Sequence, residues 1–430
     1  MELSIITLII CTVCIFIFLL EKRFVGVIYN AVWIFGMLYV AANIEEFTQI
    51  TVEILSVTII AFNAFYLLSR GIHKRKIYFT LGSYSTRRRD DCDVRLDHRF
   101  FRVIIFITVA VIGFYSARTI AAFGFNLNAI RSGNNSDSES RVFNSIVDTI
   151  LYYGIATSLL NILPIVVVYC YIKNIKLTKA EYAGVAFAVV LSVLCSAGRM
   201  LFVRIIIFIV AGMIWKTSKN SVARKISIGK AALIVAVIFG GLTIATISRN
   251  KANGTTFLAQ VLDYCYGSIV HMEYQLKLLA SDAMHFGTVV YGGFLYYPIK
   301  LLNAFLPWKL QTSNEILAYL QDFKMLTISG TPQYYNALVP NAFYYYFDSG
   351  MIGCLLFSGI LAVSCAKYEY ADNEYFERFY MFAICCYAVV FSILGGIMWS
   401  FAMPTATLFA FLLKDRLFKK IPKKEDSELL

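Results

Sequence analysis

Long apolar stretches alternate with short polar segments along most of the chain. A helix needs about 20 apolar residues to cross the roughly 30 Å hydrocarbon core of a bilayer, and stretches of that length recur. The pattern predicts about eleven membrane-spanning helices, with a range of about ten to twelve, at 2–20, 24–42, 50–69, 103–123, 147–172, 180–197, 199–215, 230–247, 341–366, 379–395 and 398–413. The predicted fold is an all-α, polytopic integral membrane protein, with 1–430 forming a single membrane domain.

Composition agrees with this interpretation. Hydrophobic residues make up 59% of the chain and charged residues 15%, and the mean hydropathy is +0.67, well outside the averages of soluble proteins. The sequence contains no P-loop, no G-x-G-x-x-G and no C-x-x-C motif, so we expect no bound metal and no nucleotide cofactor. Because the position of charge matters more than its sum in a membrane protein, the net charge of +12 does not predict nucleic-acid binding.

Basic loops set the expected topology. The segment 70–102 contains "HKRK" and "TRRRDD", and the tail 414–430 contains "KDRLFKKIPKK", so the positive-inside rule places both in the cytoplasm. Alternation then puts the N-terminus and the long polar excursion 248–340 outside. That excursion is far longer than a connecting loop, so we expect it to have its own structure.

Within this outer loop, 257–280 has apolar residues at helical spacing, which predicts an amphipathic helix at the membrane interface. The aromatic stretch 292–308 contains two glycines and two prolines, which break helices. We interpret the loop as a cap with short amphipathic helices that is partly embedded in the membrane.

The stretch "CSAGRMLFVR" lies within an apolar run from Ala180 to Trp215 that is too long for one crossing and has basic segments at both ends. It therefore predicts a hairpin of two helices, with Arg199 opening the returning helix and Arg204 about 7.5 Å deeper. Two explanations for these arginines remain open. Arg199 extends to the headgroups while Arg204 pairs with a carboxylate, or the two form an anion site whose guanidinium groups bind phosphate.

Other arginines expected outside are few, and a cluster at one level is the implied anion site. Arg118 is near the outer end of its helix, Arg131 follows in the next loop, and Arg249 comes just after a helix. For Arg141, in the same loop as Arg131, we favour a role as an interface anchor.

Two histidines and one carboxylate are candidates for proton transfer. His271 is a candidate general base, although a lone histidine in an amphipathic helix is more often structural, and His285 ranks lower. Glu273 is two residues from His271, so a helix would point the two side chains apart. Asp348, in "YYYFDSGMIG", lies inside an apolar span, where it either pairs with an arginine or supports helix packing.

At these residues the chain resembles the O-antigen polymerase (Wzy) family of bacterial oligosaccharide repeat-unit polymerases. The resemblance rests on the many spans, "SAGR" at a mid-chain hairpin, the large outer loop, and the likeness of "YYYFDSGMIG" to a Tyr-x-Asp-Phe-Gly-x-x-Gly pattern. The sequence departs from that pattern at Ser349, where the family has phenylalanine.

The resemblance implies a metal-independent, GT-C-like membrane glycosyltransferase in the bacterial inner membrane, with its active site facing the periplasm or exterior. Its donor and acceptor would be oligosaccharides on undecaprenyl diphosphate, and a flippase and a chain-length regulator are candidate partners. Arg199 would hold the diphosphate, with Arg249 second and Arg118, Arg131 and Arg204 further candidates. His271 and Asp348 would be catalytic, and the candidates for glycan contact are Tyr264, Tyr266, Glu273 and Tyr296.

Three alternatives remain open. An O-antigen ligase would use the same chemistry with another acceptor. A flippase or transporter of lipid-linked glycan should show repeated halves and charges along a central path, and neither is visible in the sequence. A noncatalytic partner in a polysaccharide assembly complex would tolerate the loss of every outer arginine.

Overall fold

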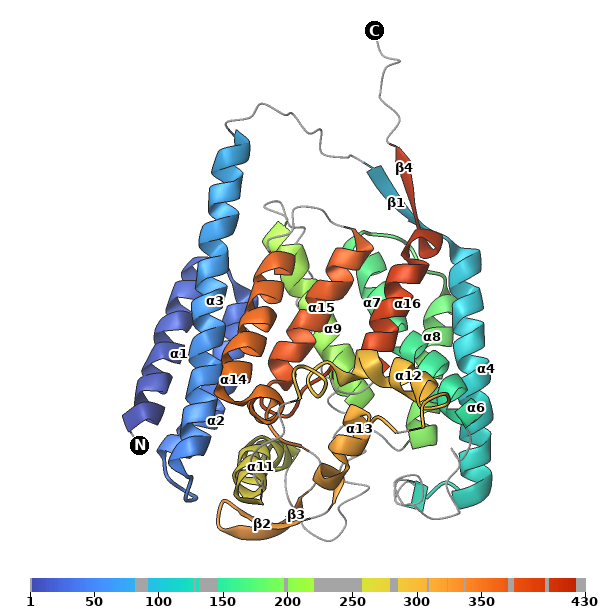
Figure 1. The fold of residues 1–430 in the computed structure, drawn as a ribbon. Helices are drawn as coiled ribbons and strands as arrows, with labels where there is room; N and C mark the ends of the chain where they lie inside the picture. Colours follow the sequence, from blue (N-terminus) through green and yellow to red (C-terminus); the bar gives the residue numbers. More distant parts are fainter. Residues whose placement is uncertain are drawn as a thin grey trace. The chain divides into compact units, whose positions relative to one another are not determined.

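The computed structural model describes residues 2–81, 92–126, 129–130, 146–196, 200–219, 257–278, 285–307, 309–322, 324–335, 338–369, 375–398 and 402–422 (Figure 1). Most of these residues are helical, as the apolar pattern predicts. Among them, seven helices are long and apolar enough to cross a membrane: α1 (Glu2–Leu20), α2 (Phe24–Ala41), α3 (Gln49–Leu81) as far as Ser69, α4 (His98–Phe123), the helical stretch Ile150–Ile172, α8 (Lys179–Ser196) and α14 (Asn341–Glu369).

Three further expected spans also coincide with helices. These are α9 (Met200–Lys219), α15 (Phe376–Phe391) and α16 (Ala402–Leu417). The expected span 230–247 lies outside the described residues. The mostly helical character is therefore observed, and several of the helices are able to cross a membrane, whereas the count of about eleven spans stays a prediction.

Contacts group the chain into two compact units that interleave in sequence. Unit 1 comprises Met1–His73, Asn250–Asp372 and Ile384–Pro404, and unit 2 comprises Lys74–Arg249, Asn373–Ala383 and Thr405–Leu430.

Polar pairs between apolar helices hold the N-terminal part of unit 1. A tight turn at Lys22 joins α1 to α2. Buried Asn30 of α2 and Asn63 of α3 exchange two amide hydrogen bonds of 2.8 and 2.9 Å. Two buried amides that satisfy each other avoid the cost of unpaired polar groups in an apolar core, so they align α2 with α3.

The remainder of unit 1 includes the described part of the long excursion 248–340, which has its own structure as expected. Its elements are α11 (Phe257–Leu278), α12 (Gly292–Leu302), the short helices α13 (Ser313–Ile316) and η2 (Ala318–Gln321), and the hairpin of β2 (Lys324–Ile328) and β3 (Thr331–Tyr335). The helix predicted at 257–280 is thus confirmed as α11. The hairpin, which the sequence analysis did not predict, turns at Ser329 and Gly330, both with positive φ.

The hairpin packs on α11 and is bonded to the turn between α2 and α3 (Figure 1). Leu326, Ile328 and Tyr335 form a small buried core against α11. The Ser329 amide donates to the Tyr39 hydroxyl at 3.2 Å, and the Gly330 amide donates to the Glu45 carboxylate at 3.1 Å. We use the name cap for residues 257–335 of unit 1 as far as they are described.

Unit 2 contains two pairs of helices, and within each pair the two helices run in the same direction. His98 and Glu181 meet near the start of α4 and α8, and Ser116 donates to the Leu191 carbonyl near their ends. In the stretch formed by α6 (Ile146–Asp148), the π-helix η1 (Thr149–Ala156) and α7 (Thr157–Ile172), Asn161 contacts Arg204 of α9. Further along, the Lys216 ammonium lies 4.8 Å from the Tyr171 ring centroid.

These directions agree with the alternation of expected spans, in which α4 and α8 cross one way and α7 and α9 cross the other. Strand β1 (Cys92–Leu96), within the basic loop 70–102, also pairs with β4 (Phe418–Pro422) in the basic tail (Figure 1). Two segments assigned to the same side of the membrane are therefore in contact. Which side is cytoplasmic stays a prediction.

The helix α14 is broken at its ninth and tenth residues, which are the motif residues Ser349 and Gly350, directly after Asp348. Ser349 has φ −153° and Gly350 has φ +62° with ψ −153°. This region of backbone space is essentially restricted to glycine. At Gly353, a side chain would collide with the Tyr345 carbonyl, which the break brings close. The two glycines therefore shape the backbone that presents Asp348.

We expect Gly350→Ala to destabilise the protein by about 1–3 kcal/mol, because alanine at this φ and ψ is strained. The melting temperature of purified protein in detergent measures the effect. Gly113→Ala in α4 is the matched control, since that glycine is helical and a methyl group there would meet its nearest neighbour at 3.6 Å. An unchanged melting temperature for Gly350→Ala would contradict the observed backbone.

Candidate functional site

The structure divides the predicted site residues between the two units. His271, Glu273, Asp348 and the three tyrosines Tyr264, Tyr266 and Tyr296 belong to unit 1, whereas Arg118 and Arg204 belong to unit 2. Arg199, Arg131 and Arg249 lie outside the described residues, so their predicted role in binding diphosphate stays a prediction.

Asp348 is fully buried, and backbone amides surround its carboxylate. Oδ1 accepts hydrogen bonds from the amides of Val289 and Val290 at 2.8 and 3.4 Å. Oδ2 accepts from the Gly287 amide and from the Ser349 hydroxyl, the latter at 2.9 Å. Both oxygens of this buried side chain are therefore satisfied by donors inside the protein.

The backbone of Asp348 holds the same segment of the cap. Its carbonyl accepts from the amides of His285 and Phe286 at 2.7 and 3.3 Å. The segment bends sharply, with positive φ at Phe286 and Gly287. Asp348 thus ties residues 285–290 to the break in α14. Of the two explanations left open by the sequence, the contacts match a packing role, because among the described residues the partners of Asp348 are amides and a hydroxyl.

His271 is buried in α11 with both ring nitrogens engaged. Nδ1 lies 3.1 Å from the Leu338 carbonyl, which can only accept, so Nδ1 carries the proton. Nε2 then accepts from the Gln275 amide at 2.8 Å. Burial lowers the pKa of His271, so the ring is neutral at pH 7. The lone pair that a general base would use is occupied in this arrangement.

Glu273 is directed to other partners, as the helical spacing predicts. Its Oε2 accepts from the hydroxyls of Thr51 and Thr48 at 2.6 and 2.9 Å, and the Lys277 ammonium lies 3.0 Å from Oε1. Burial alone would raise the pKa of Glu273, but the bonds from Thr51, Lys277 and Thr48 outweigh burial and lower it. Glu273 therefore links α11 to the start of α3.

The predicted glycan-contacting tyrosines differ in their surroundings. The Tyr266 ring stacks on Tyr39, with centroids 4.3 Å apart and planes 8° apart, so that face of the ring is covered. Tyr264 is exposed, and its carbonyl accepts from the Tyr335 hydroxyl at 2.8 Å. Tyr296 packs edge-on against Tyr297 in α12. Of the three, Tyr264 presents the most accessible ring for a sugar.

Both described arginines from the predicted site have polar partners in unit 2. Arg118 donates to the Asp148 carboxylate at 3.1 Å, and the Tyr115 hydroxyl donates to the same oxygen at 2.7 Å. Arg204 donates to the Asn161 side-chain oxygen at 2.9 Å. This contact of Arg204 is with an amide, and the carboxylate partner that the sequence analysis weighed stays a prediction. For Arg118, an anionic ligand would have to share the guanidinium with Asp148.

His285, which ranked lower than His271 in the sequence, has the more accessible imidazole. Asp348 holds its backbone, and its ring lies 5.0 Å from the Phe347 ring. Within the described part of the chain no hydrogen bond engages either ring nitrogen, and the residue is half-buried. No sequence signal distinguishes the two histidines, because the difference arises from the tertiary position of segment 285–290.

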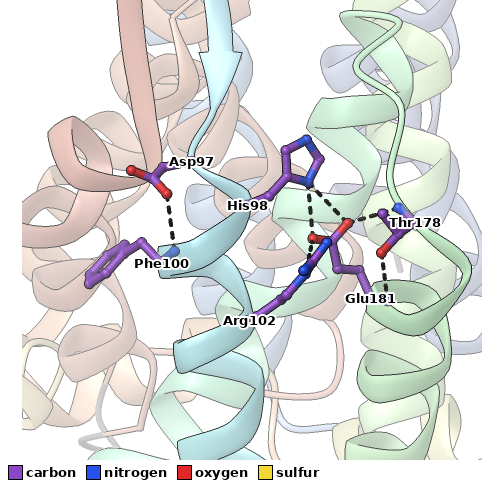
Figure 2. A network of polar contacts seen from close by, with 6 residues as sticks. All are labelled: Asp97, His98, Phe100, Arg102, Thr178 and Glu181. Carbon is purple, nitrogen blue, oxygen red and sulfur yellow. Dashed lines mark hydrogen bonds and ion pairs between the residues drawn. The ribbon is translucent and has the colours of Figure 1, made fainter.

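A polar network in unit 2 was missed by the sequence analysis (Figure 2). The side chain of Glu181 is fully buried and accepts from His98 Nδ1 and Arg102 Nε, both at 3.0 Å. It also closes a capping box with Thr178, whose amide donates to Oε2 at 2.8 Å. The Thr-x-x-Glu spacing at the start of α8 was a readable signal.

Asp97 extends this network to the strand pair of β1 and β4. It caps α4 through the Phe100 amide at 3.1 Å and pairs with Lys419 of β4 at 2.8 Å. The Lys419 bond and the Phe100 amide lower the pKa of Asp97. Since each group is engaged by a neighbour in the fold, we assign the network to holding α4, α8 and β4 together.

Comparisons of the chain with protein-family models, curated proteins and solved structures find no match. Among the described residues, no group of three or more His, Cys, Asp or Glu side chains is arranged to hold a metal ion.

We expect Asp348→Asn to destabilise the protein, because the amide nitrogen of asparagine cannot accept from the buried backbone amides. One unsatisfied buried donor costs about 1–3 kcal/mol. The melting temperature should fall, and limited proteolysis should cut the segment 285–290 sooner than in the wild type. Ser349→Ala is the control, since it removes one hydroxyl donor and leaves the amide bonds. A variant as stable as the wild type would contradict the role assigned to Asp348.

Glu273 should make stability depend on pH. Its pKa is lower in the folded state, so the charged form stabilises the fold above the unfolded pKa, and that stability is lost as pH falls through the folded value. We expect the melting temperature to drop below about pH 4.5. Glu273→Gln should be less stable at pH 7 and show a smaller drop.

Glu46→Gln is the matched control for this experiment, because Glu46 is exposed in the nearby turn between α2 and α3. It should show the wild-type pH dependence. If Glu273→Gln and the wild type lose stability in parallel, the Glu273 bonds do not contribute as described.

Proposed function

We propose that the protein is a membrane glycosyltransferase that polymerises oligosaccharide repeat units carried on undecaprenyl diphosphate. The observation that carries the proposal is the motif segment "YYYFDSGMIG", whose aspartate ties the cap to the break in α14. The second family motif, "SAGR", falls where α8 ends and α9 follows. The first motif therefore lies at a helix break beside the cap, where side chains can meet a membrane-bound substrate.

In the proposed reaction, a hydroxyl oxygen of the acceptor repeat forms a bond to the anomeric carbon of the donor glycan. The bond from that carbon to the diphosphate oxygen breaks, and undecaprenyl diphosphate leaves with the electron pair. The hydroxyl proton passes to a general base. Arginines prepositioned at the leaving diphosphate stabilise its developing negative charge, which is the main demand that the reaction makes on the protein.

The proposal assigns the diphosphate first to Arg199, with Arg249, Arg131, Arg118 and Arg204 as further candidates. Asp348 becomes a positioning residue, because its oxygens are engaged by the backbone of segment 285–290. The general base remains to be assigned. The unengaged imidazole of His285 suits proton transfer better than that of His271, whose Nε2 accepts from Gln275.

The cap supports this proposal physically. Donor and acceptor are both anchored in the membrane, so productive encounter requires a structured surface at the interface, and orientation there lowers the entropic part of the barrier. The cap is such a structure, since its helices and hairpin pack on one another and on the ends of apolar helices in unit 1.

We expect Arg199→Ala to abolish polymerisation while the protein remains in the membrane. Loss of one prepositioned charge donor reduces the rate by about 10²–10³-fold. The test is the surface-glycan profile of a deletion strain complemented with the wild type or the variant, on a gel that resolves single repeats. Arg199→Lys should also restore the ladder poorly, because lysine lacks the bidentate fork. Arg416→Ala, an exposed arginine at the end of α16, is the matched control and should restore it.

The intermediates distinguish this proposal from its alternatives. A polymerase deletion leaves single repeats on the final carrier. Accumulation of unflipped lipid-linked repeats would instead indicate a transporter, and complete chains retained on undecaprenyl diphosphate would indicate a ligase. A normal ladder from Arg199→Ala would overturn the arginine assignment. A normal ladder after loss of every outer arginine would indicate a noncatalytic partner.

A further inference from the structure

One side of α12 and of the turn that follows it is apolar and exposed. Phe294 is 48% exposed, Leu301 64% and Phe305 80%. Their spacing of seven and then four residues places them on one face of a helix, and Leu295 and Leu302 flank them. Contiguous exposed apolar surface of this kind marks a site of interaction.

The opposite side of α12 packs against α13. Gly292 lies against Ser313 so closely that a side chain at Gly292 would collide with it. Lys300 donates to Glu315 at 2.7 Å, and Glu315 in turn closes a capping box with Thr312. The orientation of α12 is therefore fixed by its neighbours in the cap, and its apolar face is directed away from them.

The turn after α12 is suited to an apolar environment. The Asn303 side chain donates to the Leu310 carbonyl and accepts from the Leu310 amide, both at 2.8 Å. This pair closes the loop that carries Phe305, and it satisfies two backbone groups that water would otherwise have to bind. Backbone that enters hydrocarbon requires such internal partners.

The start of α12 contacts a helix of the same unit that is long and apolar enough to cross a membrane. Tyr291, which precedes α12, packs edge-on against Phe357 of α14 with ring centroids 5.8 Å apart. Next to Phe357, Leu355 and Leu356 are exposed, and α14 is among the helices able to cross a membrane. Such residues face lipid, so α12 begins beside a lipid-facing surface.

We propose that α12 and the turn 303–307 insert their apolar face into the acyl layer of the adjacent bilayer leaflet, so that Phe305 contacts lipid. Lys309, which is exposed, follows Phe305 by four residues. Long basic side chains at such a position extend to the phosphate headgroups while the apolar side chains enter the layer below. Lipid contact at this face is independent of the glycosyltransferase activity proposed above.

Tryptophan fluorescence with brominated lipids tests the proposal. Phe305→Trp and Leu301→Trp are each reconstituted into bilayers with or without bromine on the acyl chains, and the wild-type signal is subtracted. We expect the added fluorescence of both variants to be blue-shifted and strongly quenched by the brominated lipid. Tyr334→Trp in β3 is the matched control, because Tyr334 is an exposed aromatic residue elsewhere in the cap. Its added fluorescence should instead be quenched by aqueous acrylamide.

Two results would overturn lipid contact. Quenching of both α12 variants by acrylamide and not by bromine would place the face in water. Quenching by neither agent would show that protein covers it, either a second copy or another part of this chain. Two variants are used so that a folding defect in one leaves the other to decide.

Discussion

A carboxylate buried among apolar helices must find its donors inside the protein, and this requirement organises both units. Asp348, Glu273 and Glu181 are each buried and each accept from two or more groups. In every case at least two of the donors come from a segment distant in the chain. Removing a charge from water is costly, so each carboxylate fixes the segments that compensate it. The contacts that locate the cap are thus the same contacts that make these charges tolerable.

Within unit 1 these contacts give the cap several separate attachments to apolar helices. Asp348 holds segment 285–290, Glu273 holds α11, and Tyr39 with Glu45 holds the hairpin turn. Each attachment is modest, since a single hydrogen bond contributes about 0.5–1.5 kcal/mol net. Together they position His285 and the exposed face of α12. Proton transfer and lipid contact, as proposed, both depend on a cap held in one orientation at the interface.

The buried charges also alter the interpretation of the candidate catalytic residues. Asp348 and His271 were candidates because polar groups in apolar surroundings are often functional. The partners of Asp348 are backbone amides of a segment about sixty residues earlier in the chain, and His271 is held by Leu338 and Gln275. Sequence patterns carry no signal for partners of this kind, because backbone amides are available at every position except proline.

The sequence by itself determined the mostly helical character, the helices long enough to cross a membrane, the division of the run 180–215 into α8 and α9, and a structured excursion that contains α11. These follow from the length of apolar runs and their helical periodicity, which are local properties. Only the tertiary structure decided the break in α14, the β2–β3 hairpin, the pairing of β1 with β4, and the partners of Asp348, His271 and Glu181. Those features depend on which distant segments come into contact. A buried polar group requires partners inside the protein, but no local sequence pattern specifies which segment supplies them.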